Sequence, residues 1–412
     1  MPPAPLLATP LGAHRLLARP GDRRLWLLDP PAAALWDLYA AGYDARQLAA
    51  LLGDSHGLDA TTAAAQVTQL LRDWQQAGML DTALAMPAAF GLGDPAEPVA
   101  PPPHPLPASP GAWMLRVADR RVGLDLAFLG DPPGLTAGFP VSRIGPRGPG
   151  PTLDHRLRLT GDPHAWCLWL DETPHAQGTT RDAALLASLG ALFLIGARPA
   201  AHLLIAHGAG LVAPDGRGLL LTAPGGSGKS TLAAALNAQG FGLLSDDVVP
   251  VTLAGELLGL NLPLCLKAGS WPVLLGCRPD LGTAPPVQRY GQTVRFLAPL
   301  TPAVTQPVPT ALILLTGYQP GQAPAAVPVP PAAALQGLLA AEAVIRDLTQ
   351  AKLEALARWV TRVPAWRLTY PDLESGLAGV RGRLAGEGAT GVRARHERLS
   401  FASELIPAGG GG

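Results

Sequence analysis

The chain has 412 residues, enough for two or three domains, and its 31 basic and 31 acidic residues give a formal net charge of zero. A balanced chain lacks the overall positive field that a general nucleic-acid binder needs. Its three cysteines (Cys167, Cys265 and Cys277) stand far apart, which argues against a disulfide framework or a zinc site and is typical of a reducing cytoplasm. We see no signal peptide, and the longest apolar run, residues 183–197, is too short to span a bilayer. We therefore expect a soluble, cytoplasmic protein with no membrane partner.

Composition divides the chain into four segments. Residues 1–81 combine a strand with short helical patterns, whereas residues 82–112 carry prolines throughout and are typical of a semi-extended linker. Residues 113–388 alternate strand-like and helical patterns, which favours an α/β domain. The last segment, residues 389–412, closes on four glycines, and we expect it to be disordered.

The first segment predicts one or two strands followed by three helices. A strand over 24–28 stops at Asp29 and two prolines, and a helix follows over 32–41. Asp44 and Gln47 have the spacing of a capping box at the start of the second helix. Asp59 starts the third helix, whose apolar residues recur at helical spacing: Val67, Leu70, Leu71 and Trp74. This order describes a small α+β unit of winged-helix type.

The larger segment predicts a strand, a helix and a second strand in close succession. The elements we expect are a buried strand over Gly218–Thr222, a helix over Ser230–Ala238 ended by Gly240, a strand over Phe241–Ser245, further strands over 312–315 and 366–370, and helices over 180–193 and 340–362.

The loop between the first of these strands and its helix has the form of a phosphate-binding loop. Residues 223–231 match the pattern G-x-x-x-x-G-K-[ST], except that Ala223 replaces the first glycine. The glycines let backbone N–H groups surround an anion at the helix N-terminus. Lys229 can reach the terminal phosphates of ATP, and the Ser230 hydroxyl can ligate Mg²⁺. The residues expected to bind nucleotide are Gly225, Gly226, Ser227, Gly228, Lys229, Ser230 and Thr231.

An acidic pair, Asp246 and Asp247, follows the next predicted strand. The carboxyl end of that strand lies at the same sheet edge as the loop, so we expect the pair to approach the γ-phosphate. One carboxylate could hold Mg²⁺ and the other could accept the proton of an attacking hydroxyl. The spacing does not divide these roles, and a solvated turn or helix cap would explain the pair without any ligand.

Together with His207 upstream, the run LLLTAPGGSGKSTLAAALNAQGFGLLSDDVVPV resembles the HPr kinase/phosphorylase family and its HPr-kinase-related branch. The resemblance implies a P-loop kinase that uses ATP and Mg²⁺, with Asp246 favoured as general base, Asp247 assisting it or binding metal, and Lys229 and His207 beside them. Lys267 stands in a segment similar to the P-x-x-L-K-x-x-S motif of that branch, which implies a place near the phosphates.

The resemblance has a limit. The signature E-[VI]-R-G-x-G of the bifunctional enzymes is absent from this sequence. The resemblance therefore does not extend to phosphorylase activity or to HPr as the substrate. Relatives of this kind are often hexamers, which leaves a homo-oligomer open.

Residues 24–81 resemble the PqqD family, the peptide-recognition elements of ribosomal peptide-modification pathways, in segments 28–38, 48–52 and 67–80. That family adds a leader peptide as a strand at its sheet edge, which implies a groove between residues 25–28 and the helix over 63–77. Winged helices also bind DNA, but residues 1–81 carry six arginines against eight aspartates, and a phosphate backbone would find little positive charge. We expect a peptide partner and no nucleic acid.

Three functions remain open from the sequence. The leading hypothesis is a kinase that phosphorylates a Ser or Thr of a precursor peptide, held through its leader by the first segment. The second is a signalling kinase acting on a folded HPr-like protein. The third is a nucleotide-gated regulatory protein without phosphoryl transfer, against which the acidic pair argues because such a protein has no chemical need for it.

Overall fold

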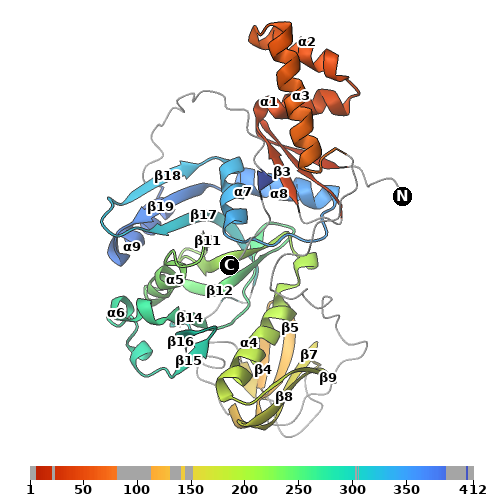
Figure 1. Cartoon of the computed structure of the whole chain (residues 1–412). Coiled ribbons are helices and arrows are strands. Elements are labelled where there is room, and N and C mark those ends of the chain that lie inside the picture. The colour runs from red at the N-terminus through yellow and green to blue at the C-terminus, as the bar shows by residue number, and fades with distance from the viewer. Residues whose placement is uncertain are drawn as a thin grey trace.

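The computed structural model describes residues 6–20, 24–80, 113–129, 141–143, 152–301, 304, 306–386 and 405–406. The linker predicted over 82–112 lies outside the described residues, as does the tail predicted over 389–412 apart from its residues 405–406. Figure 1 shows three regions that follow one another in space. The N-terminal module lies at one end of the molecule, a six-stranded sheet lies at the opposite end, and the sheet of the phosphate loop lies between them. Among the described residues, no helix has the length and apolar character needed to cross a membrane.

The N-terminal module is a small sheet covered on one face by three helices. Its antiparallel strands follow the order β1-β2-β3, and a short C-terminal strand, β20, pairs with β3 at the edge. The sequence predicted one or two strands here, and the described sheet has more because the chain before residue 24 also pairs. The elements are β1 (Leu7–Leu11), β2 (His14–Ala18), β3 (Leu25–Leu28), α1 (Pro30–Ala40), α2 (Ala45–His56), α3 (Ala60–Gln76) and β20 (Leu405–Ile406).

Side-chain caps start each of these helices; the sequence predicted those at Asp44 and Asp59, whereas it gave Asp29 only as the end of the preceding strand. Asp29 accepts from the N–H of Ala32 at 2.9 Å, before α1. Asp44 and Gln47 form a reciprocal capping box at α2, which satisfies N–H groups that a helix start leaves without partners. Asp59 caps α3 without a reciprocal bond, by accepting from the N–H of Thr62 at 3.0 Å. These helices are therefore specified by local sequence.

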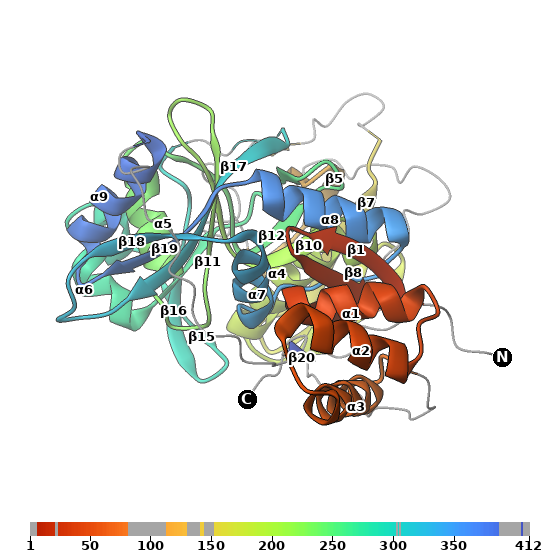
Figure 2. The ribbon, with the colours of Figure 1, turned by 90° about the horizontal axis from the view of Figure 1, so that it is seen from above.

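The other face of the module's sheet packs against the rest of the chain. Leu16 and Leu27 point to this face and belong to the same buried core as residues of α8 (Gln350–Arg362), including Leu353. Figure 2 shows β1 lying along α8. Alternate residues of β2 and β3 point to the helical face instead, where Trp26 is 2% exposed. A sheet with two buried faces fixes the module on the larger part of the protein.

A six-stranded sheet of order β6-β4-β5-β7-β8-β9 comes next in the chain, and α4 packs against it. The sequence did not separate this sheet from the phosphate-loop sheet, because both lie in the segment predicted as a single α/β domain. The elements are β4 (Trp113–Val117), β5 (Arg120–Asp125), β6 (Val141–Arg143), β7 (His155–Asp162), β8 (Ala165–Leu170), β9 (Thr173–Gly178) and α4 (Arg181–Ala197).

The phosphate-loop sheet carries helices on both faces. Leu219 and Leu221 of β11 point to the core beneath α5 and α9, while Leu220 between them points to the core beneath α7 and α8, as expected for a strand buried on both faces. Strand β11 pairs parallel with β17 and antiparallel with β10, and β10 pairs antiparallel with β12. The elements are β10 (Leu204–Val212), β11 (Gly218–Thr222), α5 (Lys229–Ala238), β12 (Gly242–Val251), β13 (Glu256–Leu257), β17 (Val308–Tyr318), β18 (Ala325–Val329), α7 (Pro331–Ala340), β19 (Ala365–Tyr370) and α9 (Leu373–Leu384).

Two predictions in this region are wrong in detail. The helix predicted over 340–362 is two helices: α7 ends at Ala340, and α8 begins at Gln350. The chain leaves the helix because Val344 exchanges two backbone hydrogen bonds with Ile205 of β10, each of 2.8 Å. The strand predicted over 241–245 also continues to Val251, because β12 stays paired with β10 to that residue.

A three-stranded antiparallel sheet of order β14-β16-β15 lies beside β12 and α5. It begins where the chain leaves the phosphate-loop sheet after β13. Its strands are β14 (Leu264–Lys267), β15 (Pro286–Arg289) and β16 (Gln292–Leu297), and the short helix α6 (Trp271–Leu274) follows β14.

Candidate functional site

The loop between β11 and α5 has the conformation that its glycines predict. Gly226 and Gly228 have φ values of +81° and +86°, a region that other residues rarely adopt. A Cβ at Gly228 would also lie 2.8 Å from the hydroxyl oxygen of Tyr370. Gly225 and Gly226 are exposed, and a Cβ on either would meet nothing within 4 Å. The loop is therefore braced on its inner side and open on its outer side, at the N-terminus of α5.

The replacement of the first glycine by Ala223 is compatible with this loop. Ala223 is not among the residues with positive φ, so its methyl group adds no backbone strain. Its carbonyl oxygen accepts a hydrogen bond of 2.6 Å from Lys229 Nζ, which also donates to the Pro224 carbonyl at 3.0 Å. The motif therefore keeps its geometry despite its departure from the usual pattern.

Ser227 and Lys229 place polar groups in the interior of the loop. The Ser227 hydroxyl oxygen is buried and has no hydrogen-bond partner among the described residues, which is uncommon for a buried polar atom. Lys229 is also buried, and burial lowers the pKa of its ammonium group, an effect that the charges of Asp246 and Asp247 oppose. An anion beside these two groups would give the Ser227 hydroxyl an acceptor and would give Lys229 an opposite charge in addition to its two carbonyl acceptors.

The acidic pair lies inside β12 and not at the end of a strand, which corrects the predicted position. The register nevertheless brings it to the loop: Gly208 of β10 is opposite Asp247 on one side and opposite Thr222, the last residue of β11, on the other. Asp247 has a φ of +74°, an uncommon conformation for a residue within a strand. Such strained residues are frequent at functional sites.

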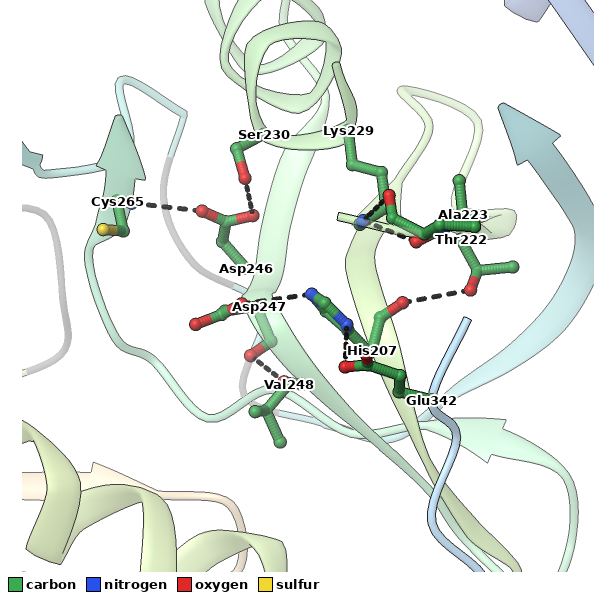
Figure 3. Close-up of polar contacts among 12 residues, drawn as sticks. His207, Thr222, Ala223, Lys229, Ser230, Asp246, Asp247, Val248, Cys265 and Glu342 are labelled. Carbon is green, nitrogen blue, oxygen red and sulfur yellow. Dashed lines mark hydrogen bonds and ion pairs between the residues drawn. The ribbon is translucent and has the colours of Figure 1, made fainter. Parts of the chain in front are cut away.

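Asp246 is the buried member of the pair, 2% exposed. Its Oδ1 accepts a hydrogen bond of 2.9 Å from the Ser230 hydroxyl, and its Oδ2 accepts one of 3.1 Å from the backbone N–H of Cys265 (Figure 3). Burial and the neighbouring charge of Asp247 raise the pKa of Asp246 to about 6. Both carboxylate oxygens are thus engaged, one of them by the loop.

Asp247 is the accessible member, with a third of its side chain exposed. Arg289 donates to its Oδ2 at 2.9 Å, and His207 Nε2 lies 3.4 Å from its Oδ1. Burial alone would raise the pKa of Asp247, but the hydrogen bonds from His207 and Arg289 lower it well below its usual value. This carboxylate is therefore ionised and open to solvent.

His207 joins Asp247 to a second carboxylate. Its Nδ1 lies 3.5 Å from Oε2 of Glu342, on the other side of the ring (Figure 3). Glu342 follows α7 with a φ of +66° and is held there because the next residues pair with β10, the strand that carries His207. The structure thus brings together His207, Asp247, Asp246, Ser230 and Lys229, as the sequence predicted for these residues.

Sequence reasoning missed two residues of the site, Glu342 and Arg289. Both come from segments far from the loop, and neither stands in a recognisable motif, so only the pairing of distant strands could have revealed them. Lys267, in contrast, is exposed at the end of β14, and its charge contributes to lowering the pKa of Lys229; its place near bound phosphates stays a prediction. Thr231 lies in the first turn of α5, half-buried.

The residues of the loop fit a nucleoside triphosphate with Mg²⁺. Glycine N–H groups, Lys229 and the free Ser227 hydroxyl suit phosphate oxygens, and the Ser230 hydroxyl suits a hard cation. Among the described residues, no cluster of three His, Cys, Asp or Glu side chains could hold a metal ion by itself. Mg²⁺ bound here would therefore depend on nucleotide phosphates as well as on Ser230, as is usual for this ion.

A second candidate site is the edge of β3 that faces away from β2 in the N-terminal module. Here β20 of the same chain pairs antiparallel with β3, Leu405 opposite Trp26 and Ile406 opposite Leu25. It appears as the small dark-blue strand beside β3 in Figure 1 and is labelled in Figure 2. The indole Nε1 of Trp26 donates to the carbonyl of Ala77 after α3, at 3.2 Å. The edge therefore accepts an added strand beside the helical layer.

Comparison with known families finds a similarity within this module. Residues 16–80 match the family model described as coenzyme PQQ synthesis protein D (PqqD). The matched range covers β2 to the end of α3, in agreement with the resemblance found in the sequence. Among curated proteins, no match to the chain was found.

Proposed function

We propose that this protein is an ATP- and Mg²⁺-dependent kinase that transfers the γ-phosphoryl group to a Ser or Thr hydroxyl of a precursor peptide. One observation carries the proposal: the hydrogen bond of 2.9 Å between Ser230, in the phosphate loop, and Asp246, in the acidic pair. It links the group that would hold Mg²⁺ to the carboxylates that would serve the acceptor. A loop that bound nucleotide only for regulation would not need the second carboxylate, Asp247.

In this proposal the loop binds and orients ATP. The backbone N–H groups of the loop and the Ser227 hydroxyl receive phosphate oxygens, and Lys229 exchanges the carbonyls of Ala223 and Pro224 for the terminal phosphates. Mg²⁺, held by Ser230 with Asp246 behind it, would neutralise charge on the phosphates. Ordered donors at positions where negative charge develops account for much of the catalytic effect in reactions of this kind.

The two aspartates take different roles, and the geometry favours the reverse of the division implied by the family resemblance. Asp246 is buried with both oxygens engaged, so it suits the metal side through Ser230. Asp247 is accessible and suits the acceptor side, where it would receive the hydroxyl proton. Although its low pKa makes it a weak base, a loose phosphoryl-transfer transition state places little demand on base strength.

His207 and Glu342 would position Asp247. The His207 ring lies between the two carboxylates, which fixes its orientation. Because Glu342 is held by the pairing of Val344 with Ile205, the three groups are supported by backbone as well as by side chains. Arrangements of this kind restrict a carboxylate to one orientation toward its substrate.

The PqqD match supports a peptide as the acceptor-bearing partner. A leader added as a strand at the β3 edge would be held on a module that shares a buried core with the α8 region. Its attached core peptide would then remain at high effective concentration near the phosphate loop. A folded HPr-like acceptor would not need this module. Deleting the N-terminal module should therefore slow transfer to a precursor peptide but not transfer to an HPr-like protein.

The proposal is tested by phosphorylation of candidate precursor peptides with ATP and Mg²⁺, followed by mass spectrometry. The expected result is one added phosphoryl group on a Ser or Thr of a peptide whose leader binds the protein. ATP binding without transfer to any peptide or HPr-like protein would favour the regulatory alternative. Transfer that is equally fast to a peptide lacking its leader would contradict capture by the N-terminal module.

A further inference from the structure

Arg289 is the last residue of β15 and stands at the tip of the β15–β16 hairpin. It is opposite Gln292 in the register, with only Tyr290 and Gly291 between them. Their φ values are +48° and +74°, as a two-residue hairpin turn of the mirror-image type requires. Tyr290 adopts this conformation at a cost and is 91% exposed. A bulky residue at such a position indicates a role for the tip itself.

The guanidinium group of Arg289 reaches from this tip to the acidic pair. It donates to Asp247 Oδ2 at 2.9 Å and lies 3.1 Å from the Cys265 sulfur. The backbone N–H of Cys265 in turn donates to Asp246. The three-stranded sheet therefore contacts both aspartates, and Arg289 is its positive charge at the accessible one.

A phosphoryl group between the loop and Asp247 would lie between two cations, one supplied by the loop and the other by this hairpin. Lys229 supplies the positive charge on the side of the loop. Arg289 supplies the positive charge at Asp247, the carboxylate on the acceptor side. Phosphoryl transfer spreads charge over three equatorial oxygens. A planar guanidinium matches two of these oxygens at once, which an ammonium group does not.

We propose that Arg289 is a catalytic arginine supplied from within the chain. Its guanidinium group moves away from Asp247 and contacts the phosphoryl group during transfer. This inference rests on the proposed kinase function. The acceptor oxygen forms a bond to the γ-phosphorus while the bond from that phosphorus to the β,γ-bridging oxygen breaks, and ADP leaves with the electron pair. The hydroxyl proton passes to Asp247, whose Oδ2 becomes available when the guanidinium group moves to the phosphoryl oxygens.

The test is the affinity of the full chain for ADP and for ADP with aluminium fluoride, in the presence of MgCl₂, by calorimetry or a fluorescent ADP analogue. Aluminium fluoride imitates the phosphoryl group in the transition state, so no acceptor needs to be known. In Arg289→Ala, we expect ADP to bind within about twofold of wild type, while the gain from aluminium fluoride falls by roughly 100-fold or more. Arg289→Lys should lose most of that gain, because lysine lacks the planar fork.

Arg217 provides the matched control, because it is an exposed arginine on the turn before β11, paired with Asp215 at 2.6 Å. Arg217→Ala should keep the wild-type affinities. An Arg289→Ala protein that keeps the full gain from aluminium fluoride overturns the inference, and so does one that loses ADP affinity to the same extent, since a structural role would do that. A wild-type protein without any gain overturns both the inference and the proposed kinase function.

Discussion

The phosphate loop and the edge of β3 are both places where backbone groups can receive a ligand, but they differ in what surrounds them. The loop lies beside a buried hydroxyl without a partner at Ser227, a buried lysine and the acidic pair. The β3 edge offers main-chain pairing alone and is paired with β20 of the same chain. The loop is therefore built for one kind of charged ligand, whereas the edge can accept many extended segments.

This difference explains how one chain could combine strict chemistry with a tolerant choice of peptide. In the proposed function, the charged groups at the loop bind a polyphosphate, because burial makes an unmatched charge costly. Strand addition takes its affinity from main-chain hydrogen bonds and requires only suitable side chains at alternate positions.

The largest effect is expected at the acidic pair. Asp247→Asn should reduce phosphoryl transfer by roughly 10²- to 10⁴-fold, the usual contribution of a positioned base, and leave ATP affinity nearly unchanged. Asp246→Asn should instead raise the Mg²⁺ concentration needed for ATP binding. Transfer rates and nucleotide titrations at several Mg²⁺ concentrations distinguish the two. The reverse pattern would restore Asp246 as the base.

Lys229→Ala should lower transfer by roughly 10²- to 10³-fold, as the loss of a single charge-stabilising donor commonly does. Lys267→Ala is the matched control, since this lysine is exposed at the margin of the site and should cost much less. Initial rates of ATP consumption give the comparison. Equal losses in the two variants would contradict the special position of Lys229.

Asp246 also predicts a pH effect on the protein without ligand. Its folded pKa of about 6 lies above its ordinary value of 3.8, so the native state binds its proton more tightly and loses stability as pH rises from about 4 to 6. At about 1.4 kcal/mol per pKa unit, the change is on the order of 3 kcal/mol. Asp246→Asn should therefore gain stability relative to wild type between pH 4.5 and 7, measured by denaturant unfolding. A difference that does not vary with pH would contradict this assignment.

The sequence predicted most completely those features that depend on neighbouring residues. The caps at Asp44 and Asp59 and the glycine loop follow from side chains within four residues of their partners, so pattern alone identifies them. Arg289 and Glu342 could not be found in this way, because Arg289 reaches Asp247 from a separate sheet and Glu342 reaches His207 beside the backbone bridge between Val344 and Ile205. The acidic pair was found, but its place inside β12 depends on pairing with β10.

The smallest effect is expected at the β3 edge. Because β20 belongs to the same chain, its pairing with β3 is intramolecular and has a high effective concentration, and an added peptide must replace it. Leu405→Pro removes a backbone N–H from this strand and should tighten peptide binding by about three- to tenfold while hydrogen exchange at Leu25–Leu28 becomes faster. A substitution elsewhere in the tail, Gly410→Pro, is the control. Unchanged exchange would mean that β20 does not compete for the edge.

The most direct measurement of the central claim is the transfer of labelled γ-phosphate from ATP to a precursor peptide by the wild-type chain and by Asp247→Asn, with nucleotide affinity measured on the same samples. Our account predicts label on a Ser or Thr of the peptide with wild type, almost none with Asp247→Asn, and equal ATP affinity for both. Equal labelling by the two proteins, or ATP binding by wild type with no labelled acceptor, would contradict it.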